Sequence, residues 1–211
     1  MQEPGEGALR RGPGDRAPDE GSGRKGRYRL SFPLGPHPAS ERLRFRLPSV
    51  TDAAFYLKLM NEPDYHRFIA DHGLSTVEDA ARYIRTKTLA RFAKSGVGLW
   101  LVEARSSGEP IGVCGLVIRP ELDHPDLGFG FLEEHRGQGL AREAATAVLE
   151  FAHKNLKLRS VCAITHPGNQ RSANLLKKVG FVQDGQRHLM EIGATSDYYL
   201  WKLRYVDEGL S

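Results

Sequence analysis

Cysteine, long apolar runs and an excess of one charge are all scarce in this 211-residue chain. Its two cysteines, Cys114 and Cys162, cannot build a disulfide framework, and both stand among strand-forming residues, which predicts buried, reduced thiols in a cytoplasmic protein. No apolar run approaches the roughly 18 residues of a membrane-spanning helix, so a membrane is not expected as a partner. The 30 basic and 26 acidic residues leave a net charge of only +4, so nucleic acid is not expected as a partner either.

Proline and glycine are unevenly distributed and divide the chain into two parts. The first 40 residues hold six of the twelve prolines and eight of the 23 glycines, and no Ile, Val, Phe or Trp occurs before residue 30. A segment so poor in apolar side chains cannot offset the entropy that it would lose on ordering. We predict a disordered tail and connector over residues 1–40 and one folded domain over residues 41–206.

Apolar periodicity in this domain predicts alternating strands and helices. Leu43 and Phe45 alternate with arginines, as in a half-buried strand, and Thr51 with Asp52 suits the cap of a following helix. A capping-box pair at residues 75 and 78 predicts the start of a longer helix. Strands are predicted over 43–47, 98–104, 111–118, 126–132, 160–165, 183–192 and 197–205, and helices over 51–60, 75–96, 140–151 and 169–179. This order gives an α/β fold: a mixed sheet with helices on both faces and one parallel β-α-β crossover in its middle.

A glycine-rich turn lies between the strand at 126–132 and the helix that follows it. Gly137 and Gly139 let the backbone approach a ligand closely, and the free amides at the start of a helix carry a partial positive charge. Together they suit an anion such as a pyrophosphate, although the same glycines would also make a simple tight turn. The Gly-Lys-Ser/Thr ending of a P-loop and the glycine spacing of a Rossmann fold are both absent from the turn.

Two motifs resemble those of the GNAT superfamily of acetyl-CoA-dependent N-acetyltransferases. Arg136-x-x-Gly139-x-Ala141 resembles the family's Gln/Arg-x-x-Gly-x-Gly/Ala signature. Asn169-x-x-Ser172, in a helix that ends in Gly-Phe, resembles its second motif. The resemblance implies the GNAT fold, with a mixed, mostly antiparallel sheet of about seven strands.

A third stretch narrows the resemblance to one branch. Residues 41–53, with their Glu-Arg-Leu-Arg-Phe-Arg start and later Thr-Asp-Ala, resemble the beginning of the Rim-type enzymes, which acetylate the N-termini of ribosomal proteins. With this stretch the resemblance covers about residues 40–205. Three motifs in one order are more specific than any one of them.

The resemblance implies a cofactor and the residues that contact it. Acetyl-CoA would be the acetyl donor, with its pyrophosphate on the amides of the glycine turn and its pantetheine arm paired with the preceding strand. The implied cofactor-binding residues are Phe131, Leu132, Arg136, Gly137, Gln138, Gly139, Leu140, Ala141 and Asn169. Asn169 is equally a good N-cap for its helix. No metal is implied, and the histidines show no paired ligand spacing.

One departure from the family concerns proton transfer. Many GNAT enzymes carry a Tyr seven residues after the motif Asn, whose hydroxyl protonates the leaving thiolate; here Leu176 takes that position. Asn169 and Ser172 remain as candidate catalytic residues, Ser172 as the acid, although Ser172 would also serve as a small packing residue. Asp126 is the candidate base, directly or through a water. Three histidines beside the same elements are further options: His124, His135 and His166.

The implied reaction is direct attack of a neutral amine on the thioester, without an acyl-enzyme. An α-amino group, with a pKa of about 7.7 to 8.0, is roughly a tenth neutral at pH 7, whereas a lysine amine, near 10.4, is neutral at only about a few parts in ten thousand. Because the chain shows no strong catalytic dyad, the sequence favours an acceptor of low amine pKa, above all an α-amino group.

Two functions remain open from the sequence. The first is an acetyl-CoA-dependent N-acetyltransferase, monomer or homodimer, that acts on a protein N-terminus or a small-molecule amine near Tyr65, His66 and Phe68. The second is a GNAT-fold acyl-CoA-binding module with little catalysis that contacts RNA or a ribosome through its tail and the basic strand at 42–46. The second function is supported only by Leu176, which stands where many GNAT enzymes carry the tyrosine.

Overall fold

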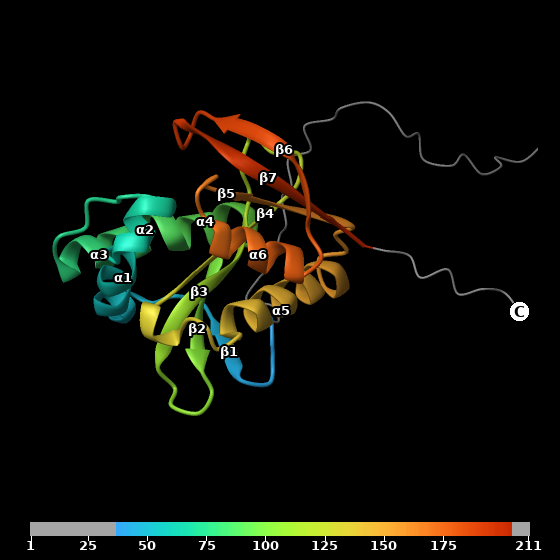
Figure 1. Ribbon diagram of the computed structural model, residues 1–211. Coiled ribbons are helices and arrows are strands. Elements are labelled where there is room, and N and C mark those ends of the chain that lie inside the picture. The colour runs from blue at the N-terminus through green and yellow to red at the C-terminus, as the bar shows by residue number, and fades with distance from the viewer. Residues whose placement is uncertain (1–36, 204–211) are drawn as a thin grey trace, which may run out of the picture.

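The structure, a computed structural model, describes residues 37–203 and contains one seven-stranded sheet (Figure 1). Its strand order is β1-β2-β3-β4-β5-β7-β6, and every neighbouring pair is antiparallel except β4 and β5. The strands are β1 (Leu43–Arg46), β2 (Leu99–Ala104), β3 (Pro110–Val117), β4 (Asp126–Phe131), β5 (Ser160–Thr165), β6 (Val182–Leu189) and β7 (Ala194–Lys202). The predicted α/β fold, with its mixed sheet and single parallel crossover, is confirmed.

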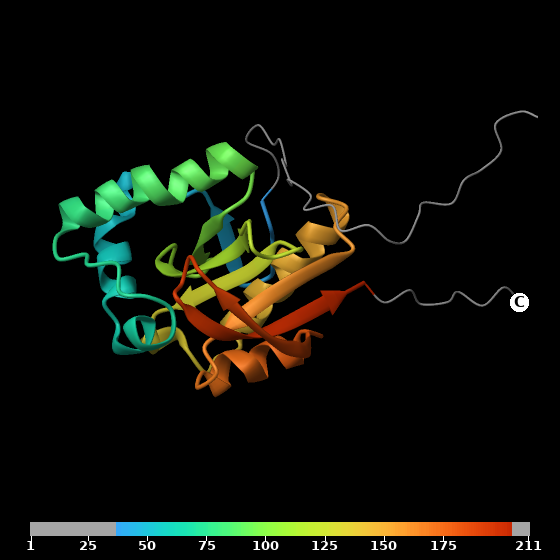
Figure 2. The ribbon, with the colours of Figure 1, turned by 90° about the horizontal axis from the view of Figure 1, so that it is seen from above.

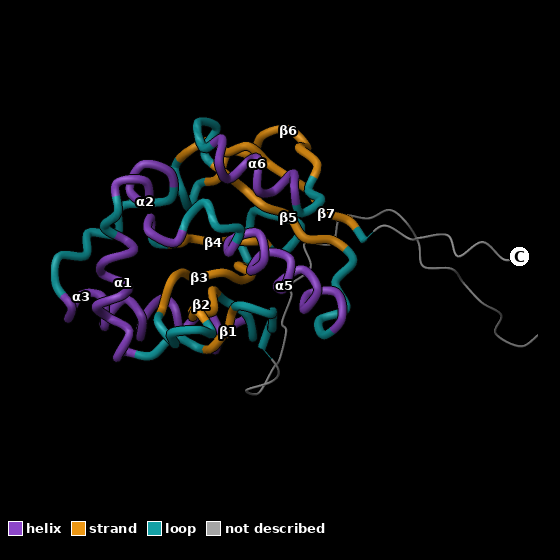
Figure 3. Tube along the Cα trace, turned by 60° about the horizontal axis from the view of Figure 1, so that its bottom comes forward, coloured by secondary structure: helices purple, strands orange, loops and turns teal. Residues whose placement is uncertain are grey.

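Helices cover both faces of this sheet (Figure 2). One face carries α5 (Leu140–Lys154) and α6 (Gln170–Lys178). The other carries α1 (Ala53–Met60), α2 (Pro63–Phe68), α3 (Val77–Tyr83) and α4 (Leu89–Ser95), with the π-helical turn Ile84–Thr88 between the last two. Figure 3 shows α1, α2 and α3 gathered at one end of the molecule, away from α5. The 3-10 turns Val50–Asp52 and Glu133–His135 complete the elements of the described chain.

The first helical segment is capped by Ser49, two residues before the predicted Thr51. The Ser49 hydroxyl accepts the Thr51 N–H, and the Ser49 N–H donates to the Asp52 carboxylate at 2.7 Å. Asp52 is the N-cap of α1, as predicted, but a short 3-10 turn with a cap of its own precedes the helix, and such a turn has no apolar period that the sequence would show. Asp52 is thus both the third residue of the 3-10 turn, where its carboxylate accepts the Ser49 N–H, and the N-cap residue of α1.

The long helical segment from α3 to α4 was predicted as one helix, and its start differs by one residue. Thr76 and Asp79 form the capping box, where the sequence analysis placed it at residues 75 and 78. Neighbouring hydroxyl and acidic residues offer the same pattern in two registers, and the structure uses the later one. Gly96 ends α4 at the predicted position, and its φ of 75° is the left-handed conformation that commonly closes a helix.

Each face of the sheet has its own apolar core. The core under α5 and α6 includes Trp100, Val148 and Leu176, and that under α1 and α3 includes Tyr56 and Leu101. The two cysteines are both free and buried within strands, as predicted. Burial raises the pKa of both thiols, so neither is an activated nucleophile.

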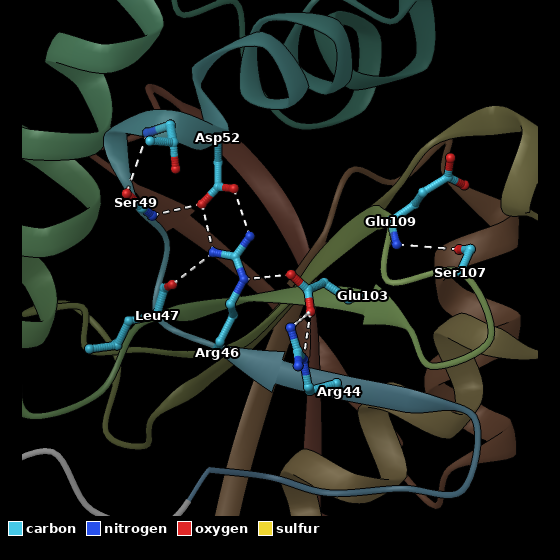
Figure 4. Close-up of polar contacts among 9 residues, drawn as sticks. Arg44, Arg46, Leu47, Ser49, Asp52, Glu103, Ser107 and Glu109 are labelled. Atoms are coloured by element: carbon cyan, nitrogen blue, oxygen red, sulfur yellow. Dashed lines mark hydrogen bonds and ion pairs between the residues drawn. The ribbon is translucent and has the colours of Figure 1, made fainter.

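At the β1 edge, four side chains form what we call the edge network: Arg44, Arg46, Asp52 and Glu103 (Figure 4). Glu103 accepts hydrogen bonds from the Nε atoms of Arg44 and Arg46 at 2.7 and 2.5 Å. Asp52 accepts two more from Arg46, both at 2.7 Å. The network ties β1 to β2 and to the start of α1. Arg44 and Arg46 are therefore paired with carboxylates, although the Arg44 side chain remains 61 % exposed.

The predicted tail lies almost wholly outside the described residues, as does the predicted end of the domain at residue 206. Within the described part, Ala39 already forms a bridge with Arg44, so regular contacts begin two residues before the predicted boundary. Between residues 37 and 203 no helix is both long and apolar enough to cross a membrane. In the same range no group of three or more His, Cys, Asp or Glu side chains is arranged to hold a metal ion.

Candidate active site

The parallel strands β4 and β5 separate almost as soon as they pair. The one Cα partner pair of their ladder is Asp126 with Cys162, and the Cys162 N–H donates to the Pro125 carbonyl at 2.9 Å. Beyond this pair, Gly128 and Phe129 are half-exposed although β4 is an interior strand of the sheet. The separation therefore leaves the backbone edge of β4 open to a ligand.

Alternation along β4 decides which backbone groups face the open edge. The Leu132 N–H donates to the Ile111 carbonyl of β3, and the Leu132 carbonyl accepts the His135 N–H, both at 3.0 Å. The backbone groups of Phe129 and Phe131 therefore point the opposite way, toward the open edge. Of the two residues that the resemblance implied for the pantetheine arm, Phe131 faces this edge and Leu132 does not. Phe129, which the sequence analysis did not name, takes the second position.

The glycine turn joins this open edge to the start of α5. Gly137 and Gly139 have φ angles of 76° and 77°, in the left-handed region that favours glycine. Gly139 is the N-cap of α5 and no side chain caps the helix, so the amides of residues 140–142 have no partner within it. These amides, at the positive end of a 15-residue helix, fit an anion such as the pyrophosphate of coenzyme A.

Arg136, the first residue of the signature, directs its side chain away from this turn's amides. Its Nε donates to the Phe131 carbonyl at 2.9 Å, and its Nη atoms pair with Asp64, also at 2.9 Å, and with Glu62. Arg136 thus fastens the turn to α2 and to the end of β4. Its guanidinium is committed to two carboxylates and is not a free cation for a phosphate.

Arg142 is a cation near the turn that the sequence analysis missed. It is exposed, and it makes no hydrogen bond or ion pair with any residue in the described range 37–203. With Arg42, Gly139 and Glu143 it lines a groove of about 400 Å³ beside the start of α5. Its place in the first helical turn, directly after the signature's Ala141, was a readable signal for a phosphate contact.

Asn169 and Ser172 lie at the start of α6, next to β5. The Asn169 Oδ1 accepts the Ser172 N–H at 3.1 Å, so Asn169 is the N-cap of α6, which was one of its two predicted readings. Both residues are half-buried and so remain accessible. Leu176 is only 1 % exposed and packs in the core, so this position brings no polar group to the open edge.

Asp126 is buried where β4 and β5 separate. Its Oδ2 accepts a hydrogen bond from Arg119 Nε at 2.8 Å, and its Oδ1 accepts the Ile164 N–H at 3.2 Å. Arg119 also pairs with Glu191, in the turn between β6 and β7, at 2.9 Å. We call Asp126, Arg119 and Glu191 the apex network. Burial raises the pKa of the Asp126 carboxyl, and the charge of Arg119 offsets part of that rise.

On the face toward α1 to α4, β4 presents two glycines in place of side chains. Gly128 and Gly130 share this face, and the ring of Tyr65 lies 3.5 Å from where a Cβ on Gly130 would stand. Tyr65 is buried against His72, whose ring in turn contacts Tyr83. Of the three residues predicted near the acceptor, Tyr65 therefore reaches β4 directly.

The other predicted candidates lie farther out. His66 is exposed, 3.9 Å from Asp71, and Phe68 contacts the ring of the exposed His166. His135 is 3.8 Å from Glu134 in the 3-10 turn after β4. His124 is half-buried, and burial lowers its pKa. Within residues 37–203 no hydrogen bond or ion pair joins a histidine to Asp126 or Ser172.

Comparison with known proteins gives matches over most of this chain. The family described as "Acetyltransferase (GNAT) domain" matches residues 42–182. A protein of Bacillus subtilis, YkkB, is 29% identical over 145 residues, which cover 67% of this chain and 82% of YkkB. The [Ribosomal protein uS5]-alanine N-acetyltransferase of Escherichia coli is 30% identical over 103 residues, 47% of this chain and 53% of that enzyme.

Solved structures agree with these matches. An acetyltransferase from Agrobacterium tumefaciens is similar with a TM-score of 0.69 at 25% identity, over 84% of this chain and 100% of that one. The aminoglycoside acetyltransferase AAC(6')-Ib, solved in complex with coenzyme A, is similar with a TM-score of 0.61 at 16% identity, over 76% and 94% of the two chains. At this identity the second likeness shows the fold alone.

Proposed function

The chain belongs to the GNAT family of N-acetyltransferases, and we propose that it moves an acetyl group from acetyl-CoA to a primary amine, with a peptide α-amino group as the favoured acceptor. One observation carries the proposal. The open edge of β4 leads, through the short 3-10 turn Glu133–His135, into a glycine turn whose helix amides are uncapped. This path matches an acyl donor with an amide-bearing arm at one end and an anionic pyrophosphate at the other.

Acetyl-CoA supplies the reactive thioester, and the chain binds and orients it. The amides of residues 140–142 would hold the pyrophosphate, with Arg142 as an added cation. The backbone groups of Phe129 and the N–H of Phe131 would pair with the pantetheine arm as a neighbouring strand does, since the Phe131 carbonyl already accepts Arg136. Asn169 would contact the same arm from the β5 side. Alignment of donor and amine supplies the main part of the rate enhancement.

Proton transfer has few candidates at this site. Ser172 is half-buried one helical turn from Asn169, and we assign it the role of protonating the leaving thiolate. Leu176, buried in the core, leaves no tyrosine hydroxyl for that role. On the acceptor side, both oxygens of Asp126 are engaged by Arg119 and Ile164.

The chemical class of the acceptor amine is inferred from this lack of a free base. The amine would approach over Gly128, which is partly exposed and leaves this face of β4 without a side chain. Without a free carboxylate there, an amine that is already partly neutral reacts fastest, and an α-amino group, with a pKa of about 7.7 to 8.0, meets that condition. The Escherichia coli relative named for ribosomal protein uS5 alanine supports the same class of acceptor. The buried thiols support a cytoplasmic setting.

Thiol release from acetyl-CoA tests the proposal. One peptide would carry a free N-terminal Ala and no Lys, and its matched control would have a blocked N-terminus and one internal Lys. A polyamine and an aminoglycoside would complete the panel. We expect release with the first peptide and at least about tenfold less with the others, because of the difference in neutral amine. Coenzyme A binding without thiol release on any acceptor would defeat the proposal.

A further inference from the structure

The hydrogen-bond ladder between β4 and β5 stops where a strand N–H bonds to a side-chain oxygen and not to a backbone carbonyl. In a parallel ladder that begins with the Cys162 N–H on the Pro125 carbonyl, the next N–H of β5, that of Ile164, would bond to the Leu127 carbonyl. Here the Ile164 N–H bonds to the Asp126 Oδ1 at 3.2 Å instead. A side chain of β4 has taken the place of its backbone.

The Asp126 carboxylate is held in this position from its other side. Arg119, whose side chain is 16 % exposed, donates to Oδ2 at 2.8 Å and is itself anchored by Glu191 at 2.9 Å. With both oxygens engaged, the side chain has one arrangement that satisfies Arg119 and Ile164 together. It stands between the two strands at the point where they begin to diverge.

We propose that Asp126 is a positioning residue that holds β5 away from β4 and so keeps the β4 edge open for the pantetheine arm of coenzyme A. This inference rests on the proposed donor site and replaces the role of base that the sequence suggested for Asp126. Without an acceptor at this place, the Ile164 N–H would be left unpaired in a buried setting or would move onto the Leu127 carbonyl. The second outcome extends the ladder and closes the edge beside Phe129.

Two variants separate this role from the role of a base. Asp126→Asn keeps a side-chain oxygen for the Ile164 N–H but has no basic carboxylate. Asp126→Leu has nearly the same shape but no acceptor, which keeps the volume filled and guards against simple loss of folding. Coenzyme A binding is measured by titration calorimetry on the full chain, and folding by circular dichroism and thermal unfolding.

We expect Asp126→Asn to bind coenzyme A within about threefold of wild type and Asp126→Leu to bind at least about tenfold more weakly. We also expect the pH profile of kcat/KM for Asp126→Asn to keep its wild-type shape. A folded Asp126→Leu variant with wild-type affinity would overturn the proposal. So would an Asp126→Asn variant that binds coenzyme A normally while kcat collapses and the acidic limb of its pH profile, which reports the protonation of a base, disappears. Absence of coenzyme A binding by wild type would instead refute the proposed function itself.

Discussion

The edge network and the apex network are built from the same kinds of side chain, arginines paired with carboxylates, in two different backbone settings. In both, a carboxylate that is less than a tenth exposed receives hydrogen bonds from arginine. At the edge, β1 and β2 are joined by four consecutive residue pairs, so Glu103 bonds only to arginine side chains. At the apex, β4 and β5 share one pair, and Asp126 bonds to a strand amide that has lost its usual carbonyl.

The backbone around a buried ion pair therefore decides the role of the pair. Where the ladder is complete, the pair fastens side chains of neighbouring elements and contributes to stability. Where the ladder stops, the same chemistry fixes the shape of an opening. We therefore expect changes at the edge to lower stability and leave binding intact, and changes around the open β4 edge and its glycine turn to do the reverse.

The largest effect is expected on binding, from Gly139→Glu. The new carboxylate would stand at the N-cap of α5 and repel the pyrophosphate, so coenzyme A affinity should fall by more than about 100-fold in titration calorimetry. Gly139→Asn is the matched control, because Asn tolerates a positive φ and adds no charge, and it should lose less than about tenfold. Equal affinities of wild type and Gly139→Glu would show that the turn binds no anion.

The largest effect on stability is expected from Arg46→Ala. It leaves Glu103 and Asp52 buried without the arginine between them, and loss of one partner from a buried ion pair costs about 3–5 kcal/mol. Because the Arg46 side chain is 31 % exposed, we expect about 3 kcal/mol in urea unfolding. Arg44→Ala, at a side chain that is 61 % exposed, is the control and should cost under about 1 kcal/mol. A change in the coenzyme A affinity of folded Arg46→Ala would show that the edge network also shapes the binding site.

A smaller effect is expected on the pH dependence of stability, with opposite signs for Asp52 and Asp126. Desolvation opposes ionisation of Asp52, but hydrogen bonds from Arg46 and the Ser49 amide outweigh it and hold the pKa of this carboxyl below 3.8. Its stabilisation is therefore present above 3.8 and is lost as the pH falls through the lowered pKa. Burial raises the pKa of Asp126, so its contribution is present below 3.8 and is lost as the pH rises through the raised value.

Urea unfolding at a series of pH values checks these signs against neutral variants. Relative to wild type, Asp52→Asn should be least stable near neutral pH and should approach wild type in acid. Asp126→Asn should gain on wild type as the pH rises above 3.8. The same sign for both variants would mean that the two carboxylates do not differ as described.

The smallest effect is expected from Glu191→Gln, at the outer end of the apex network. The Glu191 side chain is 47 % exposed, and exposed ion pairs contribute little, so stability should change by less than about 0.5 kcal/mol. Coenzyme A affinity should stay within about twofold, because Asp126 keeps both of its hydrogen bonds. A loss as large as that of Asp126→Leu would show that the outer ion pair, and not the carboxylate, keeps the edge open.

Local sequence signals predicted the strands, the long helices and the glycine turn, since each depends on residues close together in the chain. The cap at Asn169 and the helix end at Gly96 were readable for the same reason. Helix α2 was missed because its six residues carry no apolar period, and Pro63 at its start also suits a turn. The helices and strands can thus be predicted from neighbouring residues, and their boundaries can be predicted less precisely.

Contacts between distant residues could not be read in this way. Arg136 matched the family signature, but only the structure shows its guanidinium on Glu62 and Asp64, more than 70 residues away. Asp126 was recognised as a polar residue at the start of a strand, yet its bond to the Ile164 N–H depends on how two strands diverge. No spacing or composition encodes that geometry.

The most direct test of the whole account is the position of acetylation on one peptide that carries both a free N-terminal Ala and an internal Lys. Wild type and Gly139→Glu would be incubated with acetyl-CoA and this peptide, and fragment mass spectrometry would locate the acetyl group. We predict acetyl on the α-amino group with wild type and none with Gly139→Glu. Acetyl on the Lys alone, or equal modification by both proteins, would contradict the account.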